Sequence, residues 1–161
     1  MPDRKWTRLP QFDYASTGIY FITICTRKRE KILSSIVGRG LDPSLQAELT
    51  LTPYGVIAEK DLLEIPEHFP DVQILNYVIM PDHLHIIFAL GCQETEKEGS
   101  RPLPTIPNII GQYKAGVSRK CKRPIWQNYY HDHIIRNHFD FEEIWQYIDN
   151  NPLQWVLDGK T

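Results

Sequence analysis

The segment that most constrains the fold of this chain is a pair of apolar runs, 72–80 and 84–90, on either side of Pro81-Asp82. Pro-Asp between two apolar runs is typical of a turn, so we expect two strands joined by a tight connection. His83 and His85 stand at the start of the second strand with one apolar residue between them. Successive side chains on a strand point to opposite faces, so both imidazoles should lie on one face, a few ångströms apart.

This histidine pair allows two interpretations. Two neighbouring neutral imidazoles suit a divalent metal ion, and strand ends beside turns are places where sites are often built. The alternative is that each histidine is only a half-buried residue with a satisfied hydrogen bond, which is the usual role of a single strand histidine. The sequence offers no third ligand next to the pair, so its spacing leaves both interpretations open.

The remaining elements predict an α+β protein. The β-branched and aromatic run 19–26, bounded by Gly18 and a basic tripeptide, predicts a central strand buried on both faces. Further elements are expected at 47–51 (a short strand), from 53 to 65 (a helix closed by Pro66), at 91–104 (a surface loop), from 106 to 117 (an amphipathic helix), at 125–135 (an extended segment) and from Asp140 (a helix with Glu143 as capping-box partner). This order favours a mainly antiparallel sheet with helices packed on it.

The last helix carries two polar residues of interest. Its apolar positions follow the helical repeat and predict a buried face made of Phe141, Ile144, Trp145 and Ile148. Tyr147 and Asn151 flank this stripe and are four residues apart, so their side chains should lie on the same side of the helix. Tyr and Asn at such positions are also common as half-exposed polar residues, and Asn151 before Pro152 is equally typical of a helix stop.

Composition and charge exclude several classes of protein. With 42% hydrophobic residues in 161, the chain is large enough for one domain with its own core, and no apolar stretch approaches the ~20 residues of a membrane helix. No secretory signal is apparent, so we expect a cytoplasmic protein. The three cysteines, Cys25, Cys92 and Cys121, have no metal or redox spacing and are expected to be reduced.

The charge is segregated along the chain. The net charge of −2 gives no overall case for nucleic acid binding. Between Gly99 and His131, however, there is no acidic residue, and the segment holds six basic ones: Arg101, Lys114, Arg119, Lys120, Lys122 and Arg123. Such a segment suits a phosphate backbone, although a solvated helix face has the same composition.

Three ordered motifs resemble a known family. They are residues 80–85 (Met-Pro-Asp-His-Leu-His), 126–137 (Trp-Gln-Asn-Tyr-Tyr-His-Asp-His-Ile-Ile-Arg-Asn) and 147–152 (Tyr-Ile-Asp-Asn-Asn-Pro). With the Tyr-Phe-Ile-Thr strand near residue 20, they resemble the REP-associated tyrosine transposases, a branch of the single-tyrosine HUH transposases of simple insertion sequences. The resemblance reaches to Trp155, and the second motif is characteristic of the REP-associated branch.

The resemblance implies a fold, an activity and a set of site residues. The fold would be ferredoxin-like (RRM-like), in a single HUH transposase-like domain over 1–161 with a catalytic C-terminal helix. His83 and His85 would bind Mg²⁺ or Mn²⁺, Asn151 would complete the metal site, and Tyr147 would be the nucleophile. The activity would be that of a metal-dependent single-stranded DNA endonuclease and strand transferase acting through a 5′-phosphotyrosine intermediate.

A single-stranded or hairpin DNA partner would need cations along its backbone. For this role we expect residues after the first strand and on the helix that begins at Ile106, namely Arg27, Lys28, Arg29, Lys114, Arg119 and Lys120. The protein would then be nucleoid-associated. Insertion-sequence relatives act as dimers with exchanged helices whereas the REP-associated branch is often monomeric, so both a monomer and a homodimer are compatible with the resemblance.

Other functions and other site residues compete with this hypothesis. A hairpin-binding protein of transposase origin without cleavage activity would keep the same residues. A nucleotide hydrolase of the histidine-triad kind would need a third histidine where Ile87 stands. Within the chain, the rival metal pair is His131 and His133, which could also accept the proton of the nucleophile, and the rival nucleophiles are Tyr113, Tyr129 and Tyr130, of which Tyr113 is expected in the core.

Overall fold

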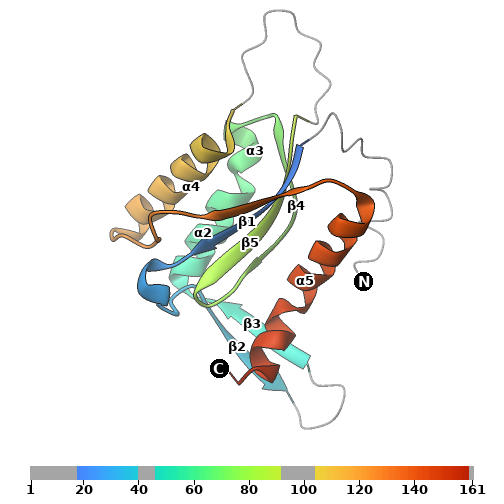
Figure 1. Cartoon of the computed structure of the whole chain (residues 1–161). Coiled ribbons are helices and arrows are strands. Elements are labelled where there is room, and N and C mark those ends of the chain that lie inside the picture. The colour runs from blue at the N-terminus through green and yellow to red at the C-terminus, as the bar shows by residue number, and fades with distance from the viewer. Residues whose placement is uncertain (1–17, 40–45, 92–103, 160–161) are drawn as a thin grey trace, which may run out of the picture.

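A four-stranded antiparallel sheet forms the centre of the protein in the computed structural model, which describes residues 18–39, 46–91 and 104–159 (Figure 1). The strand order is β4-β5-β1-β6, so β1 pairs with β5 on one side and with β6 on the other. This confirms the prediction of a central first strand. The strands are β1 (Gly18–Cys25), β4 (Val72–Ile79), β5 (His83–Leu90) and β6 (His131–Ile135).

Within the described residues, four helices and a short 3₁₀ turn complete the main body. They are η2 (Arg27–Arg29), α2 (Pro53–Leu63), α3 (Ile65–His68), α4 (Ile106–Cys121) and α5 (His138–Leu157). The side chains of Thr52 and Thr105 cap α2 and α4 by accepting a hydrogen bond from the first turn of each helix. Pro66 was expected to close the first helix, but α2 already ends at Leu63 and Pro66 lies in the first turn of α3, where its missing N–H costs no helical bond.

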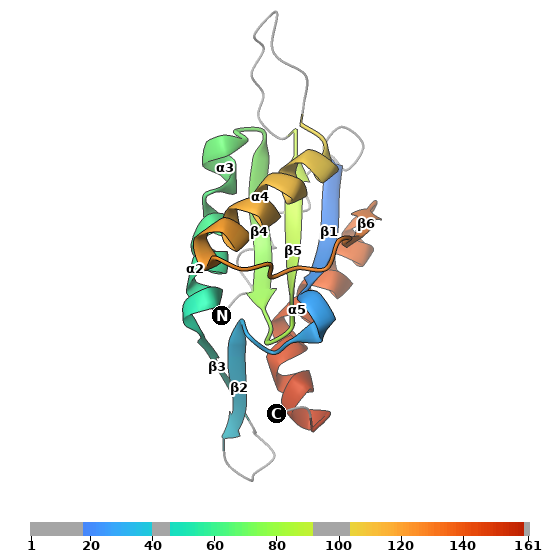
Figure 2. The same cartoon turned by 90° about the vertical axis from the view of Figure 1, so that its left-hand side faces the viewer.

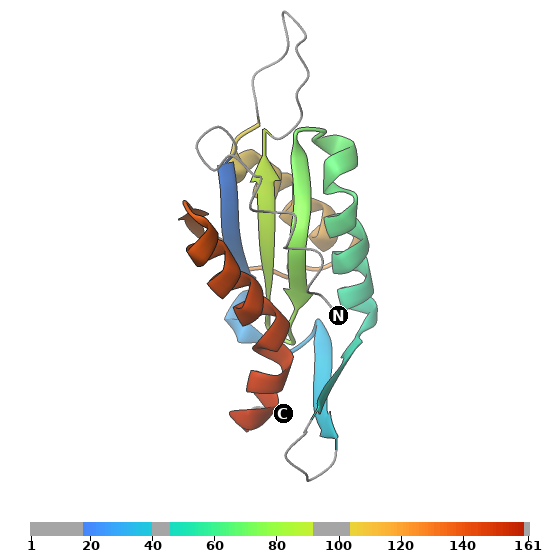
Figure 3. The same cartoon turned by 90° about the vertical axis from the view of Figure 1, so that its right-hand side faces the viewer.

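The helices pack against the sheet, as predicted, and they divide between its two faces. Figure 2 shows α4 crossing one face with α2 beside it, and Figure 3 shows α5 crossing the other face. The order β1, α2, β4, β5, α4, β6 is the β-α-β-β-α-β order of a ferredoxin-like fold. The fold implied by the sequence resemblance is therefore confirmed.

A two-stranded hairpin is inserted between β1 and α2, outside the main sheet. It consists of β2 (Ser34–Arg39) and β3 (Gln46–Leu51), and it lies below the sheet beside the C-terminal end of α5 (Figure 1). A small apolar cluster of Ile36, Met80 and Trp155 joins this hairpin to the β4–β5 turn and to α5. The end of α5 is thus held in place by the inserted hairpin.

Two features of α5 differ from the sequence prediction. The N-cap is Asn137, whose side chain accepts a hydrogen bond from the main-chain N–H of Asp140, so the cap lies three residues earlier than expected. The helix also continues through Pro152 to Leu157 instead of stopping before it. Contacts with the sheet and hairpin offset the bond that proline removes, as tertiary packing often does. The expected loop 91–104, apart from its two ends, and Cys92 lie outside the described residues; Cys25 and Cys121 are free and buried.

Candidate active site at the end of strand β5

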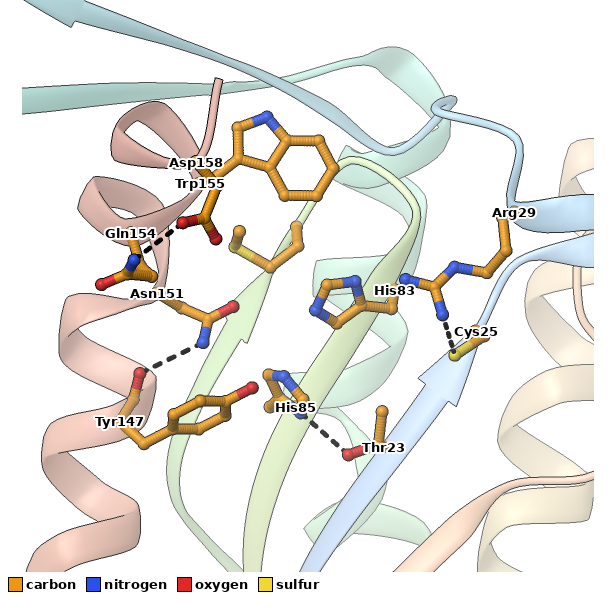
Figure 4. A pocket seen from close by; sticks show the side chains of 11 residues that line it. Thr23, Cys25, Arg29, His83, His85, Tyr147, Asn151, Gln154, Trp155 and Asp158 are labelled. Atoms are coloured by element: carbon orange, nitrogen blue, oxygen red, sulfur yellow. Dashed lines mark hydrogen bonds between the residues drawn. The ribbon is translucent and has the colours of Figure 1, made fainter. Parts of the chain in front are cut away.

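The histidine pair lies on the face of β5 that is turned toward α5 (Figure 4). In the sheet register His85 stands opposite Thr23 and His83 opposite Cys25, both on β1. The two imidazole centroids are 4.7 Å apart. His85 is buried, with 5% of its surface exposed, and His83 is half-buried. The spacing of two therefore brings both rings to one face, as expected.

The two imidazoles have different hydrogen-bond partners. His83 Nδ1 is 2.7 Å from the Asp82 carboxylate, whereas His85 Nδ1 is 2.9 Å from the Thr23 hydroxyl. Burial, helped by the charges of His83 and Arg29, lowers the pKa of His85 to about 3, so His85 is a neutral imidazole near neutral pH. In the described part of the chain, His85 Nε2 is buried and has no hydrogen-bond partner. A buried nitrogen in this state is costly unless a ligand binds it.

Helix α5 places Tyr147 over this pair. The Tyr147 ring lies 5.3 Å from the His85 ring and 6.2 Å from the Phe21 ring of β1, measured between centroids. Figure 4 shows its hydroxyl directed toward His85. The side chain remains 52% exposed, so a large substrate could reach the hydroxyl. Tyr147 thus belongs to the same site as the histidine pair, although about sixty residues separate them in the sequence.

Asn151 is one turn further along α5 and is part of its buried stripe. The sequence had placed it on the flank, but only 7% of its surface is exposed, and Trp155 continues the stripe with 6%. Its Nδ2 donates to the main-chain oxygen of Tyr147 at 3.2 Å, which leaves the amide oxygen free to face His83 across the pocket (Figure 4). A buried amide oxygen on this face is a neutral donor available to a cation.

The α5 stripe explains this arrangement. Phe141, Trp145 and Ile148 pack against the upper half of the sheet, in a cluster that includes Ile87 and Ile135. Three residues after Ile148 the same stripe reaches the pocket, and there it carries the polar side chain of Asn151. The apolar contacts therefore fix the rotation of the helix that turns Asn151 inward.

A pocket of about 270 Å³ lies among these side chains. It is formed by the ends of β1 and β5, the turn after β1, and the C-terminal half of α5. Its lining residues are Thr23, Cys25, Arg29, Met80, His83, His85, Tyr147, Asn151, Gln154, Trp155 and Asp158. The three expected metal ligands, His83, His85 and Asn151, and the expected nucleophile, Tyr147, all line this one pocket.

Asp82, behind the pocket, and Trp155, in its lining, were not assigned a role from the sequence. Asp82, which supports His83, is buried: desolvation alone would raise its pKa, but bonds from His83 and Arg29 outweigh this effect and lower it. Trp155 lines the pocket with its ring centroid 6.4 Å from that of His83, whereas Arg29, which the sequence had placed among the DNA-binding cations, lines it from the turn after β1. The sequence signal for Asp82 was its place between Pro81 and His83, which had been interpreted only as a turn.

The expected DNA-binding cations fall into two separate groups. Arg27 and Lys28 belong to the exposed turn η2, next to Arg29 at the pocket. Lys114, Arg119 and Lys120 are on α4, which covers the opposite face of the sheet (Figure 2). There the Lys114 ammonium donates to the main-chain oxygen of Gln127 at 2.6 Å, and Lys120 pairs with Asp61 at 2.6 Å. The structure does not bring the α4 group to the pocket.

The rival residues lie outside the pocket. His133 is exposed and bonded to Asp140 at 2.8 Å, and His131 is exposed on β6 beside the ring of Tyr129. Tyr113 is buried, as expected, and its hydroxyl donates to the main-chain oxygen of Ala58 at 2.8 Å. Neither Tyr129 nor Tyr130 lines the pocket.

Residues 18–39, 46–91 and 104–159 lack two kinds of structural feature. They contain no cluster of three His, Cys, Asp or Glu side chains that could hold a metal ion. The expected ligand set is different, because it combines two imidazoles with an amide. None of the helices in these ranges is long and apolar enough to cross a membrane.

Comparisons with known proteins find relatives of this chain by sequence and a similar fold by structure. No protein-family model matches the chain. An uncharacterised protein of Haemophilus influenzae is 32% identical over 172 aligned residues, which cover 96% of this chain and 91% of that protein, so the two belong to one family. A second Haemophilus influenzae protein, provisionally named a REP-associated tyrosine transposase, is 23% identical over 151 residues, covering 88% of this chain and 74% of that protein.

A solved structure of a protein of the same kind also matches this chain. It is the structure of a REP-associated tyrosine transposase bound to a REP hairpin, and it matches with a TM-score of 0.60 at 22% identity, covering 85% of this chain and 67% of that chain. The chain is similar to the REP-associated tyrosine transposases in sequence and in fold.

The three motifs that resemble the REP-associated tyrosine transposases are distributed unevenly around the pocket. The first motif, at 80–85, and the third, at 147–152, supply both histidines, the tyrosine and the buried asparagine. The second motif, at 126–137, forms β6 and the segment before it, and none of its residues lines the pocket. The pocket therefore depends on two of the three motifs.

Proposed function

We propose that this chain is a DNA strand transferase that cleaves and rejoins single-stranded DNA next to a hairpin, using Tyr147 as its nucleophile. The observation that carries the proposal is the position of Tyr147: its ring lies 5.3 Å from that of His85, in a pocket that also includes His83 and Asn151. The relation to the REP-associated tyrosine transposases supports this activity, and the neighbour bound to a REP hairpin supports hairpin DNA as the partner.

The chemistry requires an exposed phenol and a stabilised phosphate. The Tyr147 oxygen forms a bond to the scissile phosphorus while the bond from phosphorus to the 3′-oxygen breaks. The phenolic proton passes to solvent and the departing 3′-oxygen takes up a proton from solvent, which leaves a 5′-phosphotyrosine and a free 3′-hydroxyl. The phosphodiester energy is kept in the phosphotyrosine bond, so a 3′-hydroxyl can later attack it and rejoin the strands. The exposure of Tyr147 suits this role because the substrate is a polymer that must reach the hydroxyl from solvent.

The pocket has donors that fit a divalent cation. His85 is held neutral by burial and its Nε2 has no partner in the described part of the chain, while the amide oxygen of Asn151 faces the pocket. We infer that His83, His85 and Asn151 would hold Mg²⁺ or Mn²⁺. A bound ion of this kind would polarise the phosphate and offset its negative charge, and three neutral ligands would leave it its full charge for that purpose.

The decisive experiment is the capture of a covalent adduct. The full-length protein is incubated with Mn²⁺ or Mg²⁺ and a pool of labelled DNA hairpins that carry randomised single-stranded flanks, and adducts are separated on a denaturing gel. We expect an adduct with the wild-type protein and with Tyr129→Phe, which removes a similarly exposed phenol outside the pocket. Tyr147→Phe should form none. An adduct with Tyr147→Phe at the wild-type level would reject the nucleophile.

The second candidate function is hairpin binding without cleavage. The same hairpin pool separates it from the first, because binding is measured by retardation on a native gel and needs no intact nucleophile. Tight binding by both the wild-type protein and Tyr147→Phe, with no adduct in either metal, would favour this second function.

A further inference from the structure

Asp82 is a buried carboxylate that contacts two groups of the pocket at once. Only 6% of its surface is exposed. One carboxylate oxygen is 2.7 Å from His83 Nδ1, and the other accepts a hydrogen bond from Arg29 Nε at 3.2 Å. Both neighbours line the pocket, whereas Asp82 lies behind them. A residue in this position acts through its neighbours rather than on the substrate.

The main chain of Asp82 is fixed as firmly as its carboxylate. Its carbonyl oxygen accepts hydrogen bonds from the main-chain N–H of Thr26 at 3.0 Å and from the Thr26 hydroxyl at 3.1 Å. Thr26 is itself fully buried. On the other side of the turn, Met80 N–H donates to the carbonyl of His83 at 2.8 Å and closes the β4–β5 hairpin. A carboxylate on so rigid a turn holds its partners in one geometry.

The bond to Asp82 decides which nitrogen of His83 carries the proton. An ionised carboxylate only accepts hydrogen bonds, so Nδ1 of His83 must be the donor. In the neutral ring, the lone pair is then on Nε2, which faces the pocket (Figure 4). The Thr23 hydroxyl that meets His85 can donate or accept, and so it imposes no tautomer on that ring. Of the two histidines, only His83 therefore has its tautomer set by its partner.

Arg29 is held at the pocket by a turn with an unusual backbone. Lys28 and Arg29 have φ values of 55° and 54°, in the left-handed region that non-glycine residues rarely adopt. Such conformations cost about 1–2 kcal/mol per residue and often occur at functional sites. The guanidinium also donates to the Cys25 sulfur at 3.3 Å, and the side chain is still 52% exposed. Its remaining N–H groups are available for a phosphate.

We propose that Asp82 is a positioning residue that fixes His83 in the Nδ1–H tautomer and directs the Arg29 guanidinium to a phosphate of the DNA backbone. The half of the proposal that concerns the tautomer of His83 applies to the free protein. The half that concerns Arg29 rests on the proposed DNA function. Carboxylate partners of this kind orient metal-binding histidines, and their loss lowers metal affinity about 10- to 100-fold.

The tautomer half is tested by ¹⁵N NMR of the imidazoles in full-length protein without metal or DNA, with His83→Gln to assign the signals. We expect the Nδ1–H form of His83 in the wild type. In Asp82→Asn the single amide oxygen is taken by the donor Nε of Arg29, so the amide N–H groups face His83 and should reverse its tautomer. Asp132→Asn, an exposed isosteric control on β6, should leave it unchanged. An Nε2–H form of His83 in the wild type, or no reversal in Asp82→Asn, would overturn this half.

A binding measurement gives a second readout that needs no cleavage. Titration of free Mn²⁺ by electron paramagnetic resonance should show affinity reduced about 10- to 100-fold in Asp82→Asn relative to the wild type and Asp132→Asn. Equal affinities in all three proteins would contradict the positioning role.

The Arg29 half is tested by the salt dependence of hairpin binding. Arg29→Gln should lower the slope of log affinity against log salt by about one unit, because one phosphate contact is lost. Lys60→Gln removes an exposed cation of α2, a helix that contributes no residue to the pocket lining, and should keep the wild-type slope. An unchanged slope in Arg29→Gln overturns this half. A protein without any hairpin affinity overturns the proposed function and this half together, and the DNA-free NMR measurement still decides the role of Asp82.

Discussion

The two faces of the central sheet are made by alternate residues of the same strands and yet have different tasks. On β5, Leu84, Ile86 and Phe88 are fully buried under α2 and α4, in the large apolar cluster. His83 and His85 alternate with Leu84 and Ile86 in the sequence and face α5. Because one face is filled with apolar side chains, the other can hold polar groups at its end without losing the fold.

Helix α5 carries both tasks along its own length. Phe141, Trp145 and Ile148 pack on the sheet, while Tyr147 and Asn151 line the pocket. The apolar contacts anchor the helix and so set the position of its polar side chains. Substitutions on the α2/α4 face should therefore change stability, and substitutions at the end of the α5 face should change chemistry.

The largest effect should follow removal of the divalent metal. Chelation with EDTA should reduce the rate of adduct formation at least about a hundredfold, since the phosphate charge is no longer offset. The circular dichroism spectrum and the thermal melt should stay close to those of the loaded protein, because apolar contacts anchor α5. His85→Ala should reproduce the loss and His68→Ala, on the exposed end of α3, should not. Undiminished adduct formation in EDTA would contradict the metal site.

A core substitution on the other face should have the reverse effect. Phe88→Ala removes a fully buried ring and should lower the free energy of unfolding by about 3–5 kcal/mol, measured by urea denaturation. Phe139→Ala, which removes a ring that is 69% exposed, should have almost no effect. Adduct formation per folded molecule should remain the same in both variants. If Phe88→Ala lowered it selectively, the separation of the two faces would be wrong.

Much of this arrangement could be predicted because it depends on the spacing of residues within a single strand or helix. The two-residue spacing of His83 and His85 and the apolar repeat of the last helix are direct consequences of strand and helix geometry. The rotation of α5 could be predicted only approximately, so Asn151 was placed at the flank of the stripe although it is buried. The stripe was predicted from residues 141–148, but it continues to Trp155, and this extension includes Asn151.

Other parts depend on contacts that no local pattern contains. The role of Asp82 requires Thr26 and Arg29 to approach from the end of β1, more than fifty residues away. The α4 helix was correctly predicted from its repeat, but its side of the sheet is set by the crossover connections. The metal and nucleophile roles came from the family resemblance, and they stay predictions until the adduct and the metal are measured.

A smaller effect is expected for the metal ligand on α5. Asn151→Ala should lower Mn²⁺ affinity about tenfold or more, since the pocket would lose its amide oxygen. It should cost only about 1 kcal/mol of stability, because a single hydrogen bond to the Tyr147 carbonyl is lost. Asn150→Ala, at the exposed neighbouring position, should leave Mn²⁺ affinity unchanged in the same titration. Equal affinities in the two variants would remove Asn151 from the ligand set.

The smallest effect should come from a tyrosine on the opposite face. Burial raises the pKa of Tyr113 well above its ordinary value, so its phenol cannot ionise in the folded protein. Tyr113→Phe should therefore leave adduct formation unchanged and lower the free energy of unfolding by about 1 kcal/mol, the value of one hydrogen bond to the Ala58 carbonyl. Tyr147→Phe should show the opposite pattern, because its phenol is exposed at the pocket. If the two variants behaved alike in both measurements, the difference between the faces would have no functional meaning.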